Sequence, residues 1–133
     1  MIFIDTSYYF ALINHKDSTH DKAVALKKFY INNDKTSTYA VLSELATIGS
    51  QRFSRTGTIN FIENLLQGDT EIILESEELM EKTWQLFKNS KSKNISWVDC
   101  YSVAICHEYD IKKILTFDKD IPKLQRLAKK LFA

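Results

Sequence analysis

The fold class follows from the opening segment, Met1-Ile2-Phe3-Ile4-Asp5-Thr6-Ser7. Its first four residues are apolar without interruption, which is typical of a strand buried on both faces of a parallel sheet. The polar residues that follow predict a turn at the carboxyl end of that strand. In open parallel sheets this end faces the ligand site, so the polar residues after each strand are the first candidates for function.

Further along the chain, β-branched or apolar runs alternate with segments of helical periodicity. Ser18 with Asp21, Ser76 and Ser96 are expected to open helices as N-terminal caps. Alternation of strands and helices favours right-handed crossovers, so we predict a single domain over residues 1–133. Its fold class is α/β, a three-layer α/β/α domain around a mainly parallel sheet of about four strands. Strands are expected at 1–4, 36–40, 71–74 and 114–117, and helices at 8–12, 18–30, 41–48, 59–66, 76–87, 97–109 and 122–132.

Composition excludes a protein that binds nucleic acid through an overall basic surface. Eighteen Lys and Arg against 17 Asp and Glu give a net charge of +1, so a nucleic acid must be held by a local patch or a metal. Cys100 and Cys106, six apart in one expected helix, read as reduced thiols rather than a disulfide. The chain has no apolar run of membrane-spanning length and no basic leader, and a cytoplasmic location is expected.

Four carboxylates are expected at the carboxyl edge of the sheet. Asp5 follows the first strand, Asp118 follows the last, Glu44 lies early in the helix after the second strand, and Asp99 lies in the first turn after Ser96. Crowded carboxylates repel one another, and a hard divalent cation such as Mg²⁺ or Mn²⁺ relieves that repulsion. Such an ion suits hydrolysis of a phosphodiester.

Each of these acids also has a purely structural explanation. Asp5 could cap the helix after it, Asp99 could complete a capping box with Ser96, and Asp118 could belong to the turn before the last helix. Glu44 lies among apolar neighbours, where an unpaired carboxylate is costly, although a solvated helix face would accommodate it.

The ordered set of motifs resembles the PIN domain, and within that superfamily the VapC-type toxins of bacterial toxin–antitoxin pairs. Asn14 and His20 also lie where many relatives carry these residue types. Ile121 departs from the family pattern, which often has an aromatic residue there, so the register of the closing motif is open. The motifs are Ile4-Asp5-Thr6-Ser7, Ser43-Glu44-Leu45, Trp97-Val98-Asp99-Cys100 and Leu115-Thr116-Phe117-Asp118-Lys119-Asp120.

The resemblance implies a metal-dependent ribonuclease. By carry-over, Asp5, Asp99 and Asp118 would hold Mg²⁺ or Mn²⁺, and Glu44 would ligate the ion or position the attacking water. It further implies a homodimer and a VapB-type antitoxin that obstructs the site. Asp120 competes for the role given to Asp118, and the hydroxyls expected to orient carboxylates or waters belong to Thr6, Ser7 and Thr116.

Basic residues near the site are candidate phosphate contacts, although most lysine-rich faces are simply solvated. Aromatic residues that could stack on bases are Tyr8, Tyr9, Tyr39 and Trp97, with core packing as the alternative. The candidate RNA contacts are Arg52, Arg55, Lys119 and Lys123, then Lys88, Lys91, Lys93, Arg126, Lys129 and Lys130.

Two alternative functions remain open. One is a non-catalytic PIN-like module that binds RNA or protein, and the other is an RNA-processing nuclease without an antitoxin.

Overall fold

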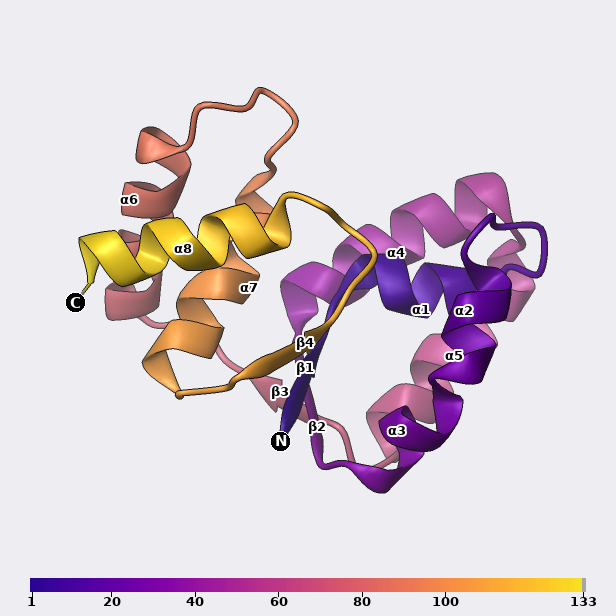
Figure 1. Cartoon of the computed structure of the whole chain (residues 1–133). Helices are drawn as coiled ribbons and strands as arrows, with labels where there is room; N and C mark the ends of the chain where they lie inside the picture. The colour runs from indigo at the N-terminus through magenta and orange to yellow at the C-terminus, as the bar shows by residue number, and fades with distance from the viewer. Residues whose placement is uncertain (133) are drawn as a thin grey trace. The chain divides into compact units, whose positions relative to one another are not determined.

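The chain forms two compact units (Figure 1). Unit 1 contains residues 1–73 and 113–117, and unit 2 contains residues 74–112 and the chain from Asp118 onward. The structure is a computed structural model, and it describes residues 1–132. No helix in that part of the chain combines the length and the apolar character needed to cross a membrane.

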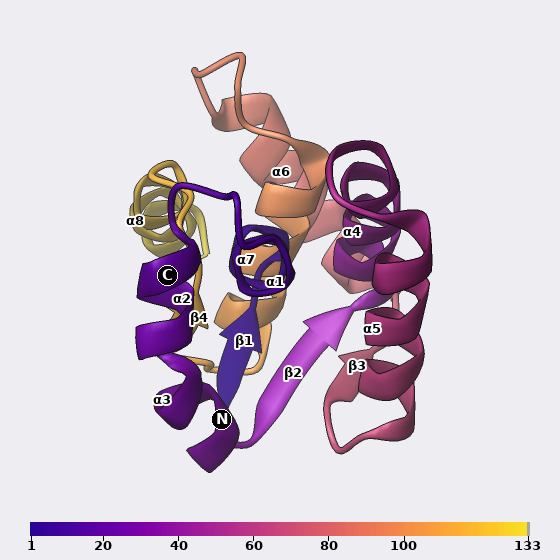
Figure 2. The same ribbon diagram turned by 90° about the vertical axis from the view of Figure 1, so that its right-hand side faces the viewer.

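Unit 1 contains the whole sheet, in the order β3-β2-β1-β4 with every neighbouring pair parallel (Figure 2). The central strand β1 (Ile2–Ile4) is buried throughout, as its uninterrupted apolar sequence predicts. The prediction of an α/β fold with a parallel sheet of about four strands is confirmed. The other strands are β2 (Lys35–Thr38), β3 (Glu71–Ile73) and β4 (Lys113–Leu115).

The helices of unit 1 connect β1 to β2 and β2 to β3, and side-chain hydrogen bonds shift some of the predicted boundaries. The strand expected at 36–40 ends at Thr38, because the Thr38 hydroxyl accepts the Val41 N–H at 3.1 Å and starts a helix. The capping box at Ser18 does not form, since Asp17 Oδ1 accepts the Thr19 N–H at 2.8 Å instead. The helices are α1 (Thr6–Ile13), α2 (His20–Ala25), α3 (Lys27–Asn32), α4 (Tyr39–Arg52) and α5 (Arg55–Gln67).

Unit 2 consists of α6 (Glu77–Asn89), α7 (Trp97–Glu108) and α8 (Ile121–Leu131). The predicted cap of α6 is confirmed, since the Ser76 hydroxyl accepts the Leu79 N–H at 3.2 Å. Helix α7 packs against both α6 and α8, and its residues from Asp99 to Cys106 are all buried. Its two cysteines are buried and not joined by a disulfide, as predicted.

Candidate active site

Asp5 lies at the carboxyl end of β1, beside β4. Its side chain is 2% exposed, and its N–H donates to the Leu115 carbonyl at 3.0 Å. From β1 the chain proceeds to β2 and β3 on one side, and it returns to β4 on the other side. Such a reversal of strand order opens a crevice at the carboxyl edge of a parallel sheet, and ligands of open α/β folds bind there.

Two hydroxyls fix the Asp5 carboxylate. Its Oδ2 accepts the Ser7 hydroxyl at 2.7 Å and the Thr116 hydroxyl at 2.7 Å. The Ser7 oxygen in turn accepts the Phe117 N–H at 2.8 Å, which ties the turn after β1 to the turn after β4. Asp5 stands at the N-cap position of α1 without a side-chain capping bond, so the structural explanation of this acid as a helix cap is wrong.

The atoms around this carboxylate fit a hydrated hard cation. Within residues 1–132, Asp5 Oδ1 accepts no hydrogen bond from the protein. Over the same residues, the buried Thr6 hydroxyl next to it in the chain has no hydrogen-bond partner. A carboxylate oxygen and a hydroxyl are the donors that Mg²⁺ and its bound waters prefer. The oxygen chemistry therefore agrees with the predicted Mg²⁺ or Mn²⁺.

Glu44 lies in the second turn of α4, which starts directly after β2. Its side chain is half-buried, between the exposed Ser43 and the buried Leu45. The preceding strand is fastened to β1, because the Ser37 hydroxyl donates to the Ile4 carbonyl at 3.0 Å. Helices α1 and α4 also pack on each other, so the helices that follow Asp5 and carry Glu44 are neighbours in unit 1.

Asp99 lies in the first turn of α7 in unit 2 and has a structural role. Its Oδ2 accepts the Ser96 N–H at 3.0 Å, and its own N–H donates to the Ser96 hydroxyl at 3.1 Å. This reciprocal pair is the capping box that the sequence allowed as the structural explanation. The carboxylate is 7% exposed. Burial, and then the charge of Asp99, raise the pKa of the neighbouring Cys100 thiol to about 12.

Asp118 and Asp120 belong to the turn that leads into α8. Asp118 Oδ1 accepts the Asp120 N–H at 2.9 Å, and the Asp118 carbonyl accepts the Ile121 N–H. Asp118 was expected directly after the last strand, but β4 already ends at Leu115 because the next two residues bond to Ser7 and Asp5. The Asp120 carboxylate lies 3.5 Å from the Lys123 ammonium.

The structure places two of the four predicted acids in each unit, Asp5 and Glu44 in unit 1, and Asp99 and Asp118 in unit 2. In residues 1–132, no three His, Cys, Asp or Glu side chains are grouped as metal ligands. Among the predicted site residues, the structure brings the hydroxyls of Ser7 and Thr116 into hydrogen-bond contact with the Asp5 carboxylate.

Residues 2–128 match the PIN domain, a match that runs through both units. The chain belongs to the PIN domain family. It is 28% identical over 120 residues to the 23S rRNA-specific endonuclease VapC20 of Mycobacterium tuberculosis, strains CDC 1551 / Oshkosh and H37Rv, covering 90% of this chain and 91% of that protein. The predicted resemblance to VapC-type PIN domains is confirmed.

The fold has a close counterpart among solved structures. The crystal structure of Mycobacterium tuberculosis VapC20, described as a Sarcin-Ricin loop cleaving toxin, matches with a TM-score of 0.83 and 23% identity. The match covers 92% of this chain and 94% of that chain. At this identity the likeness establishes the fold, and the predicted PIN-like α/β/α architecture is confirmed.

The aromatic candidates in this PIN domain separate into core and surface residues. Tyr8 and Tyr9 are fully buried, so the core alternative is right for both. Burial, together with the nearby Tyr30, raises the pKa of Tyr8 to about 12. Tyr39 and Trp97 remain exposed, at 57% and 38%. The cationic candidates Arg52, Arg55, Lys119 and Lys123 are also exposed.

Sequence reasoning missed two contributors to the Asp5 site. The Phe117 N–H, which anchors Ser7, is a backbone group and leaves no mark in the sequence. The Ser37 hydroxyl, which holds the end of β1, lies in a polar strand where every residue is buried. Because buried hydroxyls need hydrogen-bond partners, the hydroxyl-rich sequence Lys-Thr-Ser-Thr in an expected strand could have indicated such contacts.

Proposed function

We propose that this PIN domain, taken as one domain over residues 1–133, is a metal-dependent endoribonuclease that hydrolyses RNA phosphodiester bonds. The observation that carries the proposal is the buried Asp5 carboxylate, whose Oδ2 is held by the Ser7 and Thr116 hydroxyls. This arrangement contributes no cap to α1. A buried carboxylate oriented by hydroxyls, with its second oxygen open to a cation, is suited to ligating a metal.

Asp5, Glu44, Asp99 and Asp118 are the proposed ligands of Mg²⁺ or Mn²⁺. When bound, the ion would lower the pKa of a water and neutralise charge on the scissile phosphate. Ser7 and Thr116 orient Asp5, and Ser96 fixes one oxygen of Asp99. Glu44, half-buried on α4, would hold the ion or accept a proton from the attacking water.

Contacts to the RNA backbone are proposed for exposed cations at the ends of helices. Arg52 ends α4 and Arg55 begins α5, while Lys119 and Lys123 flank the start of α8. Over residues 1–132, Lys123 pairs with Asp120, and the other three form no ion pair. Contacts of this kind position a nucleic acid without reading its sequence.

We also propose that the protein is a cytoplasmic toxin with a VapB-type antitoxin, by analogy with VapC20, which is described as a toxin. A homodimer is supported by exposed aromatic side chains in unit 2. Trp84 and Phe87 of α6 stack at 6.3 Å, and Trp97 lies 6.1 Å from Phe87. Exposed apolar clusters of this kind mark protein interfaces. Light scattering should show a dimer that Trp84→Glu dissociates, whereas Tyr109→Glu, also exposed, should not.

The experiment is cleavage of 23S rRNA and of a sarcin–ricin-loop hairpin, the RNAs on which VapC20 is described as acting. The purified protein is incubated with the RNA in the presence of Mg²⁺ or Mn²⁺, and separately with a chelator. The Asp5→Asn variant is tested with the same metals. Metal-dependent cleavage that the variant lacks is expected. RNA binding without cleavage under all conditions would contradict the enzyme and favour a binding module. RNA cleavage by the protein, together with the absence of an antitoxin gene next to the gene that encodes it, would favour the RNA-processing alternative.

A further inference from the structure

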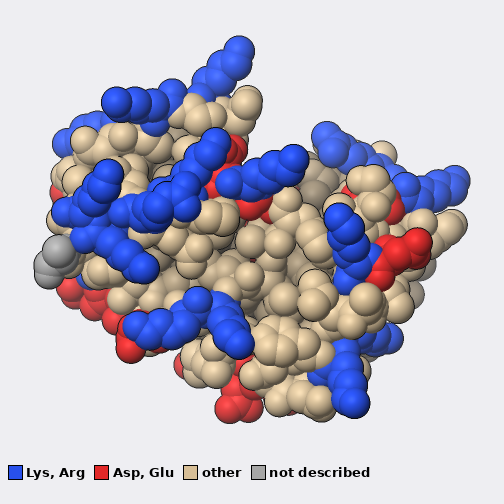
Figure 3. Space-filling model, in the orientation of Figure 1, with Lys and Arg blue, Asp and Glu red and all other residues tan. Residues whose placement is uncertain are grey.

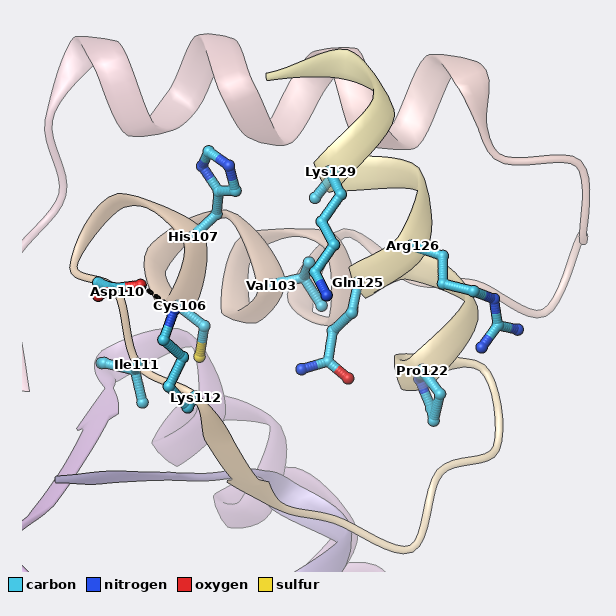
Figure 4. Close-up of a pocket in the computed structure, with 11 residues that line it drawn as sticks. Val103, Cys106, His107, Asp110, Ile111, Lys112, Pro122, Gln125, Arg126 and Lys129 are labelled. Carbon is cyan, nitrogen blue, oxygen red and sulfur yellow. Dashed lines mark ion pairs between the residues drawn. The ribbon is translucent and has the colours of Figure 1, made fainter. Parts of the chain in front are cut away.

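A pocket of about 560 Å³ lies in unit 2, between the carboxyl end of α7 and helix α8 (Figure 4). Its volume is in the range of small-ligand sites. None of the four proposed metal ligands lines it. The pocket was not predictable from the sequence, because its walls come from two helices and the turn after α7.

The wall of the pocket is partly apolar and partly polar. Its apolar floor is formed by Val103, Cys106, Ile111 and Ala128, which are almost fully buried, and Pro122 adds an exposed apolar surface at the start of α8. A flat ring such as a nucleobase can pack against an apolar surface of this kind while its polar edge meets polar groups.

Polar groups stand at the mouth of the pocket. In Figure 4 the Lys129 ammonium and the Gln125 amide extend toward the space between the helices, while Arg126 points outward beside it. Among residues 1–132, neither Arg126 nor Lys129 forms an ion pair. These two cations therefore have their full charge to offer an anion, and the amide can donate to and accept from a base edge.

The turn after α7 fixes a third cation at the rim. Asp110 has a φ of 54°, the left-handed conformation usually reserved for glycine at this place. The Ile111 N–H donates to the Cys106 carbonyl at 2.8 Å and the Asp110 N–H to the His107 carbonyl at 3.4 Å, which closes the helix. Asp110 and Lys112 form an exposed ion pair at 2.5 Å, so this third cation is paired, unlike Arg126 and Lys129.

The pocket opens beside the most basic segment of the chain. Residues 119–130 carry five Lys or Arg and one acid, Asp120, in a protein whose net charge is only +1. In Figure 3 basic side chains gather over the region of α8. A basic surface next to an apolar pocket with an amide is complementary to a nucleotide, since it matches a phosphate and a base at once.

We infer that this pocket takes up one nucleotide of a single-stranded or looped RNA, with its base over the apolar floor beside Pro122 and its phosphate on Lys129 and Arg126. The inference rests on the proposed ribonuclease function and adds a substrate contact outside the carboxylates. An unpaired base held here would favour RNA loops over regular duplex, whose bases are stacked and paired.

The test uses the full chain in chelator, so that binding is measured without cleavage. The four nucleoside 5′-monophosphates and inorganic phosphate are titrated into labelled protein, and NMR shifts are followed at Val103, Ile111 and Gln125. Lys129→Ala is compared with Lys130→Ala, which removes the same charge from the same turn of α8 but does not line the pocket. Gln125→Phe blocks the mouth in a second variant.

At least one nucleotide should shift the pocket residues saturably and bind more tightly than phosphate. Lys129→Ala should weaken it about tenfold, as expected for a lost charge-assisted hydrogen bond, and Lys130→Ala should leave it nearly unchanged. Equal weakening by both variants, or nucleotide binding no tighter than phosphate, would overturn the inference.

The same variants are then tested with an RNA hairpin by fluorescence anisotropy in chelator. Weaker hairpin binding by Lys129→Ala and Gln125→Phe than by Lys130→Ala supports a contact with the RNA. Unchanged hairpin binding, together with loss of free nucleotide, would refute the substrate role. Asp5→Asn should retain nucleotide binding, so a failed nuclease assay and a failed pocket are distinguished.

Discussion

Asp5 and Asp99 are both buried acids next to the start of a helix, yet their carboxylates are held in different ways. Asp5 is gripped by two hydroxyls, from Ser7 and Thr116, and makes no capping bond to α1. Asp99 accepts the Ser96 N–H and completes the capping box of α7. The Asp5 arrangement orients a charge, whereas the Asp99 arrangement also stabilises a helix.

This difference shows why an acid at a helix start is ambiguous evidence for function. A carboxylate in a capping box stabilises its helix whether or not a metal binds. Asp5 makes no capping bond of this kind, and its burial carries a desolvation cost. Asp5 is therefore the better single indicator of a site, and variants at the two positions should differ in stability even where both lose activity.

The largest expected effect is that of Asp5→Asn. We expect about a thousandfold loss of RNA cleavage, because a neutral amide is a poor metal ligand. The free energy of unfolding should stay unchanged or rise slightly, since the Asn oxygen still accepts both hydroxyl bonds and the desolvation cost of a buried charge is removed. Cleavage kinetics and thermal unfolding measure the two effects. The control is Asp21→Asn, an exposed acid of the same unit, and equal activity of the two variants would remove Asp5 from the site.

Asp99→Asn should combine a comparable loss of cleavage with a loss of stability of about 0.5 kcal/mol. The amide oxygen can still accept the Ser96 N–H, but the negative charge at the N-terminus of α7 is gone.

Ser96→Ala should separate helix capping from the proposed metal binding by Asp99. It costs about 1 kcal/mol of stability through the lost cap and keeps the carboxylate, so cleavage should fall by less than about threefold. A large loss of cleavage in Ser96→Ala would mean that the cap itself positions the site.

Ser7→Ala and Thr116→Val should each lower cleavage or metal affinity about 10- to 100-fold, the usual cost of removing a group that orients a ligand. Ser7→Ala should also destabilise the fold by about 1 kcal/mol, because the Phe117 N–H loses its acceptor. Thr47→Val, which removes an exposed hydroxyl on α4, is the matched control. Wild-type metal affinity in both variants would show that these hydroxyls serve packing only.

The smallest effect is expected for Asp120→Asn. The Asp120 carboxylate pairs with the exposed Lys123, and pairs of this kind contribute about 0–1 kcal/mol. Cleavage should fall by less than about threefold, whereas Asp118→Asn should be nearly inactive. Steady-state kinetics of the two variants decide which aspartate acts, and the reverse order of activities would assign the ligand to Asp120.

The sheet was predictable because its central strand is apolar without a break and is followed at once by polar residues. Sequence reasoning failed at boundaries set by side-chain hydrogen bonds. Thr38 ends β2 by capping α4, and Asp17 captures the Thr19 N–H that a longer helix would need. A break also separates α2 from α3 at Leu26, and the spacing of the apolar residues does not predict this break.

The candidate site was predictable to a similar extent. Asp5 with its hydroxyl neighbours followed from position after a strand and from the family resemblance, and the Ser96–Asp99 capping box was readable from spacing. The Phe117 N–H and the left-handed Asp110 were not readable, because backbone geometry depends on packing between segments distant in the chain. The pocket between α7 and α8 depends on the same kind of packing.

The most direct test of the central claim is a Mn²⁺ titration of the full chain, followed by electron paramagnetic resonance in the absence of RNA. The wild-type protein should bind Mn²⁺ saturably, Asp21→Asn should match it, and Asp5→Asn should lose the site. Binding by Asp5→Asn with wild-type affinity would contradict the assignment of Asp5 as a metal ligand, and with it the account of how this PIN domain cleaves RNA.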